Sequence, residues 1–298
     1  MNDIMVSVCV LSYNHEKYLR DCLEGIVMQK TTFPIEVWVH DDASTDSSPD
    51  IIRAYQNRYP NVIKPILQTE NQYSKRQGSI LSRFVFPKCT GKYIALCEGD
   101  DYWTDPLKLQ KQVDFLEGHE EYSMCFHSAI LLNECDAKVT SSYSIVKEGD
   151  YGPNDIFPRW VVPTASVVFS REKFDSYNLI HTEWFVFGDI VIFERCAHVG
   201  KLWGFEERMS VYRMNGNSVL QDKKYQDPRL QAMPFHFKAL KMNFPLINKK
   251  VLNQLIADSY YAKMRNDSHV LEKGIDFFRF VFASPSYSTQ KLLGKFLK

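Results

Sequence analysis

The stretch GKYIALCEGDDYWTDP, residues 91–106, joins an apolar strand to an acidic turn. Residues 92–97 form a short apolar run, typical of a strand that is covered on both faces. Directly after it come Glu98, Asp100 and Asp101, here called the acidic turn. Carboxylates this close repel one another unless a positive group lies among them. Capping a helix that starts near Pro106 needs only one of them. The turn therefore indicates either such a cap with solvated neighbours or a site for a cation.

Three further strands precede this one, and helical patterns separate them. The apolar runs lie at residues 5–11, 35–40 and 62–68, and the helical spacings lie at 18–26, 49–58 and 78–86. Regular alternation of strand and helix predicts a mainly parallel sheet with both faces covered. Ligands of such sheets bind beyond the carboxyl ends of the strands. Polar residues follow three of those ends, and we call them the polar rim: Ser12, Tyr13, Asn14, Asp41, Asp42, Glu98, Asp100 and Asp101.

The acidic turn has the chemistry of a divalent-cation site. Mg²⁺ and Mn²⁺ prefer hard oxygen ligands, and they commonly bind through one or two carboxylates together with substrate phosphates. A cation held there neutralises charge on a leaving diphosphate. Because two other polar strand ends share the same rim, the pattern favours a nucleotide-diphosphate site over a simple helix cap.

Composition and charge exclude several classes of protein. The chain has 298 residues, 45% of them hydrophobic, with 36 basic and 36 acidic side chains. A zero formal charge argues against an extended nucleic-acid surface, which depends on phosphate neutralisation. Seven scattered cysteines without a CxxC pair predict buried free thiols and no zinc site. Without a signal peptide or an apolar run of 18 residues, the expected location is the cytoplasm.

The second half of the chain is less regular. A helix is predicted at 108–117, strands near 124–132 and 165–169, a helix at 189–198 and a strand at 209–213. Beyond residue 221 the pattern is helical. A first turn rich in glycine would indicate a dinucleotide-binding dehydrogenase or a nucleotidyltransferase, but the chain has LSYNHEKY there. Both classes are therefore excluded.

Three segments resemble the family 2 glycosyltransferases with a GT-A fold: VSVCVLSYNHEKYLRDCLEGIVMQ, IEVWVHDDASTDSS and GKYIALCEGDDYWTDPLKLQKQVDFLE. The resemblance extends more loosely to FGDIVIFERCAHVGKL and MSVYRMNGNSV. It implies an α/β, Rossmann-like, mainly parallel central sheet flanked by helices, with a smaller acceptor-side lobe and C-terminal helices. The implied domains are a glycosyltransferase domain at 1–220, with a nucleotide-sugar half at 1–105 and an acceptor half at 106–220, and a helical extension at 221–298.

The resemblance also implies roles on the polar rim. Ser12, Tyr13 and Asn14 would lie against the nucleotide. Asp41 or Asp42 would accept a hydrogen bond from a ring N–H of the base. Glu98 and Asp100 occupy the family's Asp-x-Asp motif, with Glu98 in place of the commoner aspartate. Asp100 and Asp101 are then the expected ligands of Mn²⁺ or Mg²⁺ and of the ribose-diphosphate.

The remaining expected site residues lie outside the acidic turn. Asp189 matches the family's catalytic base, since a carboxylate near a sugar hydroxyl can take its proton; the alternative is a helix N-cap. Arg213 matches a position near the donor phosphates, and Asn215 stands where histidine is common. Arg76 is a further candidate for the diphosphate, with a solvated loop arginine as the alternative.

The implied function is an inverting glycosyltransferase that uses a nucleotide-sugar, expected to be a UDP-sugar. Its acceptor would be a glycan or lipid-linked glycan of bacterial surface polysaccharide, and no nucleic acid is expected as a partner. The alternative is a noncatalytic protein that keeps the fold and binds the nucleotide-sugar. In the tail, FFRFVF and KLLGKFLK combine apolar bulk with basic residues. They predict either peripheral contact with the inner face of the cell membrane or an ordinary packed helix.

Overall fold

The computed structural model describes residues 3–75, 78–134, 138–140, 145–215, 223–266 and 270–296. The chain divides into two compact units. The first comprises Met1–Asn178 and Ile192–Gly216, and the second comprises Leu179–Val191 and Asn217–Lys298. The first unit contains the sheet, and the second contains the C-terminal helices. The finer domain boundaries expected at residues 105 and 220 stay predictions.

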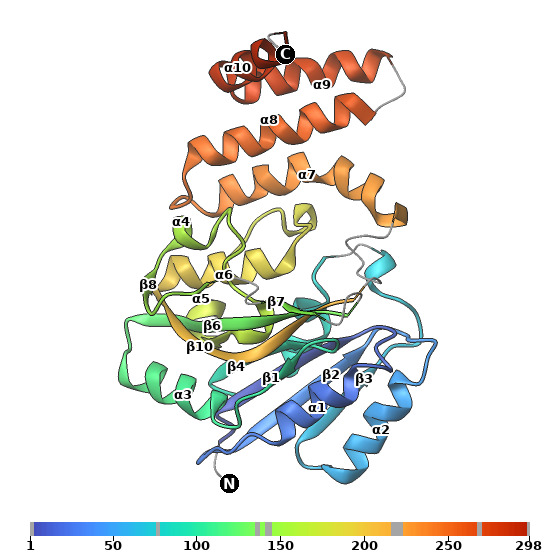
Figure 1. The fold of residues 1–298 in the computed structure, drawn as a ribbon, viewed down its shortest axis with the longest axis vertical. Coiled ribbons are helices and arrows are strands. Elements are labelled where there is room, and N and C mark those ends of the chain that lie inside the picture. The colour runs from blue at the N-terminus through green and yellow to red at the C-terminus, as the bar shows by residue number, and fades with distance from the viewer. Residues whose placement is uncertain are drawn as a thin grey trace. The chain divides into compact units, whose positions relative to one another are not determined.

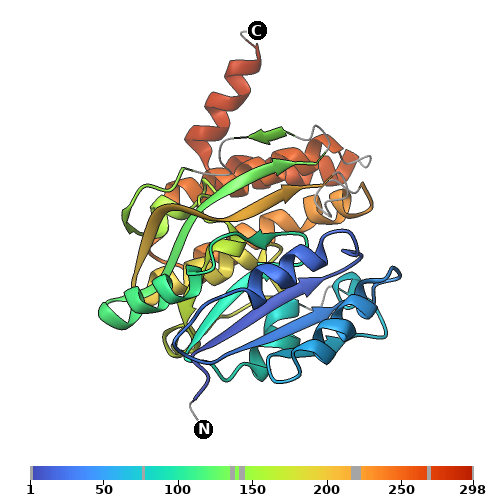
Figure 2. The same cartoon turned by 60° about the horizontal axis from the view of Figure 1, so that its bottom comes forward.

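Four parallel strands form one half of the sheet, in the order β3-β2-β1-β4. Their bounds are Val6–Ser12 for β1, Ile35–Asp41 for β2, Ile63–Leu67 for β3 and Tyr93–Glu98 for β4. Each lies within one residue of its predicted ends. Figure 2 shows the two blue strands β1 and β2 side by side and pointing the same way. The predicted parallel sheet is confirmed.

The other half of the sheet is mixed. Beyond β4 follow β9 (Val168–Ser170), β6 (Tyr122–Asn133), β10 (Lys201–Met214) and β5 (Tyr102–Trp103). Strand β10 runs parallel to β6, whereas β9 is antiparallel to both β4 and β6. Two short strands lie off this path: β7 (Lys138–Thr140) pairs with β6, and β8 (Gly149–Tyr151) pairs with β10.

Three predicted elements differ from the structure. Strand β10 begins at Lys201 instead of 209, because residues 201–205 also pair with β6, and register shifts then accommodate the polar residues that follow. In the predicted helix at 78–86, only Leu81–Val85 (η2) forms a helical turn, of the π type, between η1 (Tyr73–Lys75) and η3 (Phe86–Lys88). Similarly, 164–166 is a 3₁₀ turn, η4, ahead of β9.

Both faces of the sheet are covered, as the alternating pattern predicts. Side chains alternate along β1, so Val8 and Cys9 belong to opposite core clusters. One face packs against α1 (Leu19–Val27), α2 (Ser48–Arg58) and α3 (Lys108–Gly118), the first two of which lie beside β1 to β3 in Figure 1. The other face packs against η2, α5 (Arg171–Ser176) and residues 192–197 of α6 (Gly188–Val199). The short α4 (Pro153–Ile156) and η5 (Thr182–Trp184) complete the helices before the C-terminal part.

The second unit is built mainly from four helices, which confirms the predicted C-terminal helices. They are α7 (Lys223–Asn243), α8 (Lys249–Asn266), α9 (Val270–Ala283) and α10 (Pro285–Phe296), and α7, α8 and α9 lie in successive layers in Figure 1. Phe280 of α9 is fully buried against Tyr261 of α8. In the part of the chain that the structure describes, no helix combines the length and hydropathy needed to cross a bilayer.

The described cysteines are buried and free, as predicted: Cys9, Cys22, Cys89, Cys97, Cys125 and Cys196. Cys135 lies outside the described residues.

Candidate functional site

The ends of β1, β2 and β4 lie at the same level of the sheet. Ser12 is level with Asp41, and Leu11 is level with Glu98. The Gly99 N–H donates to the Leu11 carbonyl at 2.8 Å. A Cβ on Gly99 would lie 2.9 Å from that carbonyl oxygen and 2.8 Å from Nδ1 of His15, so a side chain is excluded here. The polar rim is thus assembled by main-chain bonds between strand ends.

Residues 12–14 connect the first strand end to the second. Asn14 adopts a left-handed conformation with φ of 57°, which asparagine tolerates well. Its N–H donates to Ser44 Oγ at 2.9 Å, and its Oδ1 accepts from the Thr45 N–H at 2.8 Å. Ser12 is buried and Tyr13 is exposed. These bonds fix the conformation of the segment, whose contact with a nucleotide stays a prediction.

Asp41 is committed to the turn that follows β2. Its carboxylate accepts hydrogen bonds from both the N–H and the hydroxyl of Ser44, and the residue is 1% exposed. Ala43, between the two, has φ of 60°, an unusual conformation for alanine. Asp41 therefore stabilises a strained turn.

Asp42 faces a different segment of the chain. Its carboxylate accepts from the backbone N–H groups of Gln72 at 2.7 Å and Tyr73 at 2.9 Å. A carboxylate has about four acceptor positions, so a further donor can still be accommodated. Tyr73 itself is exposed, and the sequence analysis did not include it. An aromatic residue in an otherwise polar loop was the only signal that could have found it.

Asp100 is the partly exposed carboxylate of the acidic turn. Its Oδ2 accepts from Asn215 Nδ2 at 2.9 Å and lies 3.9 Å from Nε2 of His15. Its side chain is 23% exposed, so a ligand can reach it. His15 was not predicted as a site residue. Glu98 is half-buried at the end of β4, and its carbonyl accepts the Asp101 N–H at 2.9 Å.

Asp101 points into the protein, whereas the cation-ligand role expected of it needs an accessible carboxylate, and that role stays a prediction. It is 1% exposed, and its Oδ1 accepts the backbone N–H of Arg213 at 2.9 Å. Burial first, and then the charges of Asp100 and Glu98, raise the pKa of this carboxyl well above its usual range. A buried carboxyl of this kind joins the acidic turn to β10.

Arg213 also has partners within the protein, and its expected phosphate contact stays a prediction. Its guanidinium forms ion pairs with Asp21 and, at 3.1 Å, with Glu134. It also lies over the rings of Tyr102 and Tyr18, at 4.5 and 5.1 Å from their centroids. The side chain is 7% exposed. The contacts describe an arginine that holds α1, β5 and β10 together.

Asp100 is suited to bind a cation together with ligands from a substrate, rather than as one of several protein ligands. Among the described residues, no group of three or more histidine, cysteine, aspartate and glutamate side chains is arranged to hold a metal ion. Mg²⁺ and Mn²⁺ bind in sites with one or two carboxylates when substrate phosphates supply the other ligands. The partly exposed Asp100 meets that requirement, and the buried Asp101 does not.

Asp189 belongs to the second unit and lies in the first turn of α6. Its Oδ1 accepts the Ile190 N–H at 2.9 Å, and burial raises the pKa of the carboxyl above its usual value. A position in the first turn of a helix is compatible with both interpretations of Asp189, the helix cap and the catalytic base. Arg76, the last expected site residue, lies outside the described residues.

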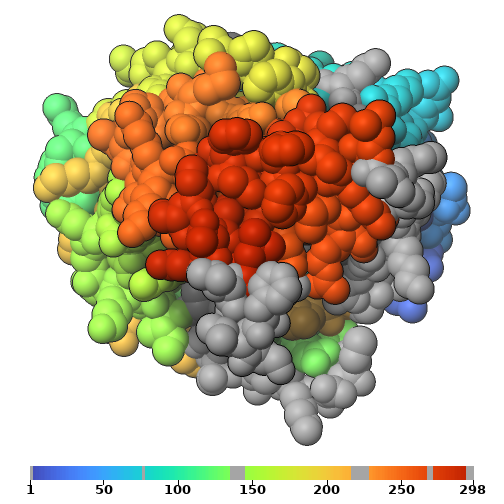
Figure 3. Space-filling view, turned by 90° about the horizontal axis from the view of Figure 1, so that it is seen from above, coloured from blue at the N-terminus to red at the C-terminus, as the bar shows by residue number. Residues whose placement is uncertain are grey.

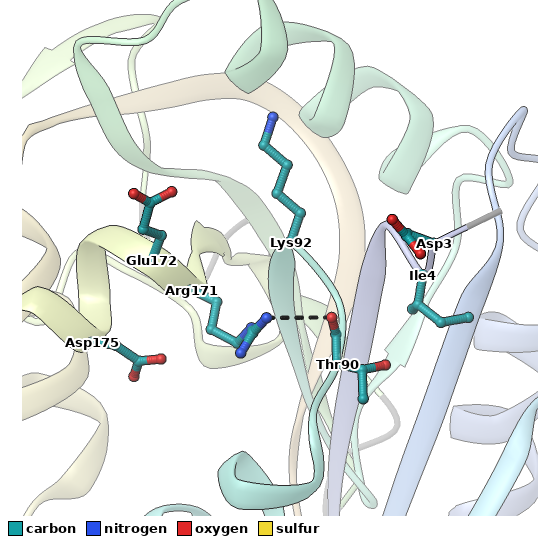
Figure 4. Close-up of a pocket in the computed structure, with 7 residues that line it drawn as sticks. All are labelled: Asp3, Ile4, Thr90, Lys92, Arg171, Glu172 and Asp175. Carbon is teal, nitrogen blue, oxygen red and sulfur yellow. Dashed lines mark hydrogen bonds between the residues drawn. The ribbon is translucent and has the colours of Figure 1, made fainter.

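A hollow of about 830 Å³ lies away from the polar rim, near the amino end of β4. Figure 4 shows the residues that line it, including Lys92, Arg171 and Asp175. Arg171 donates to the Thr90 and Gly91 carbonyls, at 3.4 and 2.7 Å. Of the predicted site residues that the structure describes, none lines this hollow.

The sheet and its strand order define an α/β protein in which polar side chains follow the ends of three neighbouring parallel strands. Residues 7–144 match the family model described as "Glycosyl transferase family 2", so the chain carries a domain of that family. Of the solved structures, Staphylococcus aureus TarS in complex with UDP-GlcNAc is similar with a TM-score of 0.66 and 14% identity, covering 96% of this chain and 83% of that one. The mannosyltransferase PcManGT of Pyrobaculum calidifontis, in complex with GDP-Man and Mn²⁺, gives 0.54 and 16%, covering 97% and 89%. The GT-A fold is thereby confirmed.

Sequence relatives are also similar to the chain. An uncharacterized protein of Mycobacterium tuberculosis is 37% identical over 219 residues, which cover 72% of this chain and 60% of that protein. The chain thus spans about 60% of the length of such relatives. The Escherichia coli protein WfaP, a UDP-Glc:alpha-D-GlcNAc-diphosphoundecaprenol beta-1,3-glucosyltransferase, is 30% identical over 149 residues, 50% of this chain and 54% of WfaP.

Proposed function

We propose that this protein transfers a sugar from a UDP-sugar to an acceptor hydroxyl, with inversion at the anomeric carbon. The observation that carries the proposal is the partly exposed Asp100 at the end of β4, level with the ends of β1 and β2 in a family 2 domain. TarS binds UDP-GlcNAc and WfaP uses UDP-Glc, which supports uridine as the base.

The donor would lie along the polar rim. Ser12, Tyr13 and Asn14 would contact the nucleotide, and Asp42 would accept the N–H of the uracil ring, with Asp41 as the alternative. Asp100 would hold Mn²⁺ or Mg²⁺, for which the Mn²⁺ complex of PcManGT is the support. Such a cation supplies positive charge that stabilises the departing diphosphate. Asn215 and His15 flank Asp100 and orient its carboxylate.

Asp189 would act as the general base. It would take the proton of the acceptor hydroxyl while the acceptor oxygen forms its bond to the anomeric carbon. At the same time the bond from that carbon to the diphosphate breaks, and the nucleoside diphosphate leaves from the opposite face. The upward shift in the pKa of Asp189 moves it in the direction that makes a carboxylate a better base.

The acceptor would be a glycan or lipid-linked glycan of bacterial surface polysaccharide. WfaP, whose acceptor is a diphosphoundecaprenol-linked sugar, supports a lipid-linked acceptor. We further propose that the protein works in the cytoplasm, in peripheral contact with the inner face of the cell membrane.

The testing experiment is a donor screen with Mn²⁺, followed by an Asp189→Asn variant. We expect hydrolysis of one UDP-sugar in preference to GDP-Man, and a product of inverted configuration by NMR. Asp189→Asn should retain donor binding by calorimetry and lose turnover ~10²–10⁴-fold, because the amide cannot accept the proton. Glu183→Gln, which changes an exposed carboxylate in the same segment, is the matched control and should keep full turnover.

The noncatalytic alternative gives a different result in the same screen. A protein that only binds the nucleotide-sugar would show calorimetric binding and no hydrolysis of any donor. Retention of the donor's configuration, or near-normal turnover in Asp189→Asn, would remove Asp189 from the role of base.

A further inference from the structure

The segment that leads to the proposed base is bound to helix α7. Residues 185–189 read FVFGD and belong to the second unit, together with all of α7. The N–H of Val186 donates to Nδ1 of His236 at 3.3 Å. The imidazole also lies nearly perpendicular to the rings of Phe187 and Phe185, whose centroids are 5.4 and 6.1 Å away. One side chain of α7 thus contacts both the main chain and two side chains of this segment.

His236 is suited to accept this bond because it stays neutral. The residue is 1% exposed, and burial lowers the pKa of its imidazole to about 4. Near pH 7 the ring therefore carries a proton on one nitrogen and a lone pair on the other. Because Nδ1 accepts from Val186, the proton is assigned to Nε2. Figure 3 shows the orange and red atoms of α7 to α10 on the outer surface of the second unit, and the buried His236 lies beneath this surface.

A second residue on the same face of α7 binds the chain further upstream. Asn243 follows His236 by seven positions, about two turns of the helix, so both side chains project from one face. Its Oδ1 accepts the Ile180 N–H at 2.8 Å, and its Nδ2 donates to the Ile180 carbonyl at 2.9 Å. The two attachments differ in their separation from Asp189, which is nine residues for Ile180 and three for Val186.

The bond to His236 restricts the position of Asp189. A chain of three residues spans at most about 11 Å, so the main chain of Asp189 lies close to the bonded Val186. On its other side, Ile190 is 1% exposed and is fixed in the interior. A general base must lie within hydrogen-bond reach of the proton that it takes, and a misplacement of about 1 Å can lower turnover ~10²-fold. Loosening this segment therefore affects the proposed base.

We infer that His236 is a positioning residue for the general base. Through its bond to Val186 and its contacts with the two flanking phenylalanines, it fixes the main chain from which Asp189 reaches the acceptor hydroxyl. The inference rests on the proposed role of Asp189. It gives helix α7, which lies outside the residues 7–144 matched by the family model, a part in the reaction.

Turnover of two His236 variants tests the inference, with UDP-GlcNAc and UDP-Glc as donors and Mn²⁺ present. Asparagine carries an oxygen as many bonds from Cα as Nδ1 is, so His236→Asn keeps an acceptor for Val186. Phenylalanine has a ring but no acceptor. We expect His236→Phe to lower kcat ~10–10²-fold with donor Kd unchanged within about twofold, and His236→Asn to stay within about fivefold of the parent. Met242→Ala, which changes a half-exposed methionine of α7, is the control and should match the parent.

A double variant separates positioning from general stabilisation. If His236 acts through Asp189, adding His236→Phe to Asp189→Asn should lower turnover by no more than about twofold further, because the group that it positions is already gone. Asn243→Leu breaks the more distant attachment and should keep kcat within about threefold of the parent. Hydrogen exchange at the Val186 amide reports the bond itself, and it should become at least ~10-fold faster in His236→Phe but not in His236→Asn.

The outcomes distinguish the role of His236 from that of Asp189. Normal kcat in a folded His236→Phe variant, or an equal loss in the parent and Asp189→Asn backgrounds, overturns the inference. An inactive parent, or near-normal turnover in Asp189→Asn, refutes the proposed function instead and removes this inference with it. Thermal unfolding shows whether each variant folds. If His236→Phe does not, His236→Gln replaces it, because the glutamine oxygen lies one bond further from Cα than Nδ1 does.

Discussion

Two aspartate pairs follow neighbouring strands of the same sheet, yet the protein uses them differently. After β2, Asp41 and Asp42 both accept hydrogen bonds from nearby loops, in which Ser44, Gln72 and Tyr73 are the donors. After β4, Asp100 remains partly exposed, whereas Asp101 is buried beneath it and accepts the Arg213 N–H. Both members of the first pair accept hydrogen bonds from loops, whereas in the second pair only Asp101 is committed to the fold and Asp100 keeps access to solvent.

The difference shows that an acidic residue at the end of a strand need not be available to bind a ligand. A carboxylate whose acceptor positions are filled by backbone N–H groups stabilises the local chain. A carboxylate with solvent access and one amide partner, like Asp100, can accept a cation without unfolding its surroundings. The following predictions test what these carboxylates, and one buried carboxyl elsewhere, do.

The largest expected effect is on turnover at the acidic turn. Asp100→Asn should lower donor turnover by at least ~10²-fold, because the amide cannot offer the negative charge that a divalent cation requires. Asp101→Asn keeps an oxygen for the Arg213 N–H and should stay within about fivefold of the parent. Steady-state hydrolysis in Mn²⁺ measures both. Equal losses in the two variants would contradict the division of roles.

A buried carboxyl that accepts no hydrogen bond from any residue the structure describes extends the comparison. Glu194 of α6 is fully buried, and burial raises its pKa to about 8. Its folded-state pKa exceeds the unfolded value, so the unfolded chain releases the proton first, and stability falls as pH rises from about 4.5 to about 8. Glu194→Gln should remove this loss and stabilise the protein by a few kcal/mol, at most about 5, at pH 8, and by little at pH 4.5.

Urea unfolding of both proteins at the two pH values measures the Glu194 effect. The difference between variant and parent is the informative quantity, since other groups titrate in both. A Glu194→Gln variant less stable than the parent at pH 8 would contradict this. It would mean that the Glu194 carboxylate is ionised in the folded protein and pairs with His198, whose Nδ1 lies 3.6 Å from Glu194 Oε2.

A smaller effect is expected on stability at the acidic turn. Asp101→Ala leaves the buried N–H of Arg213 without its acceptor, and this should cost about 1–3 kcal/mol of unfolding free energy. Asp100→Ala loses only a partly exposed amide contact and should cost about 0.5 kcal/mol or less. Denaturant unfolding measures both losses of free energy. A larger loss for Asp100→Ala than for Asp101→Ala would show that Asp100 is the carboxylate that stabilises the fold.

An effect of similar size is expected on recognition of the nucleotide base. Asp42→Ala should weaken UDP binding by about 1–3 kcal/mol. Removing the carboxylate also loosens the loop at Gln72 and Tyr73, so CDP serves as the control ligand. Uracil offers a ring N–H at the position where cytosine offers an acceptor. The parent should therefore prefer UDP, and Asp42→Ala should lose that preference. A preference retained in Asp42→Ala and lost in Asp41→Ala would assign the base contact to Asp41.

The sequence predicts the parallel half of the fold because its strands are short, apolar and separated by regular helices. Their polar ends could be located for the same reason. The direction of each carboxylate could not, since Asp101 turns inward to meet a backbone N–H 112 positions away. Arg213 similarly takes its partners from Asp21 and Glu134, which no local pattern connects to it. The early start of β10 depends on its pairing with β6 and was missed because GFEER interrupts the apolar pattern.

Calorimetric titration of UDP into the parent chain and Asp100→Asn, each with Mn²⁺ and with EDTA, tests the central claim most directly. Asp100 is proposed to bind a cation that in turn holds the donor diphosphate. We expect the parent to bind UDP at least tenfold more tightly with Mn²⁺ than with EDTA, and Asp100→Asn to bind equally weakly in both. UDP affinity in the parent that is the same with Mn²⁺ and with EDTA would contradict the account.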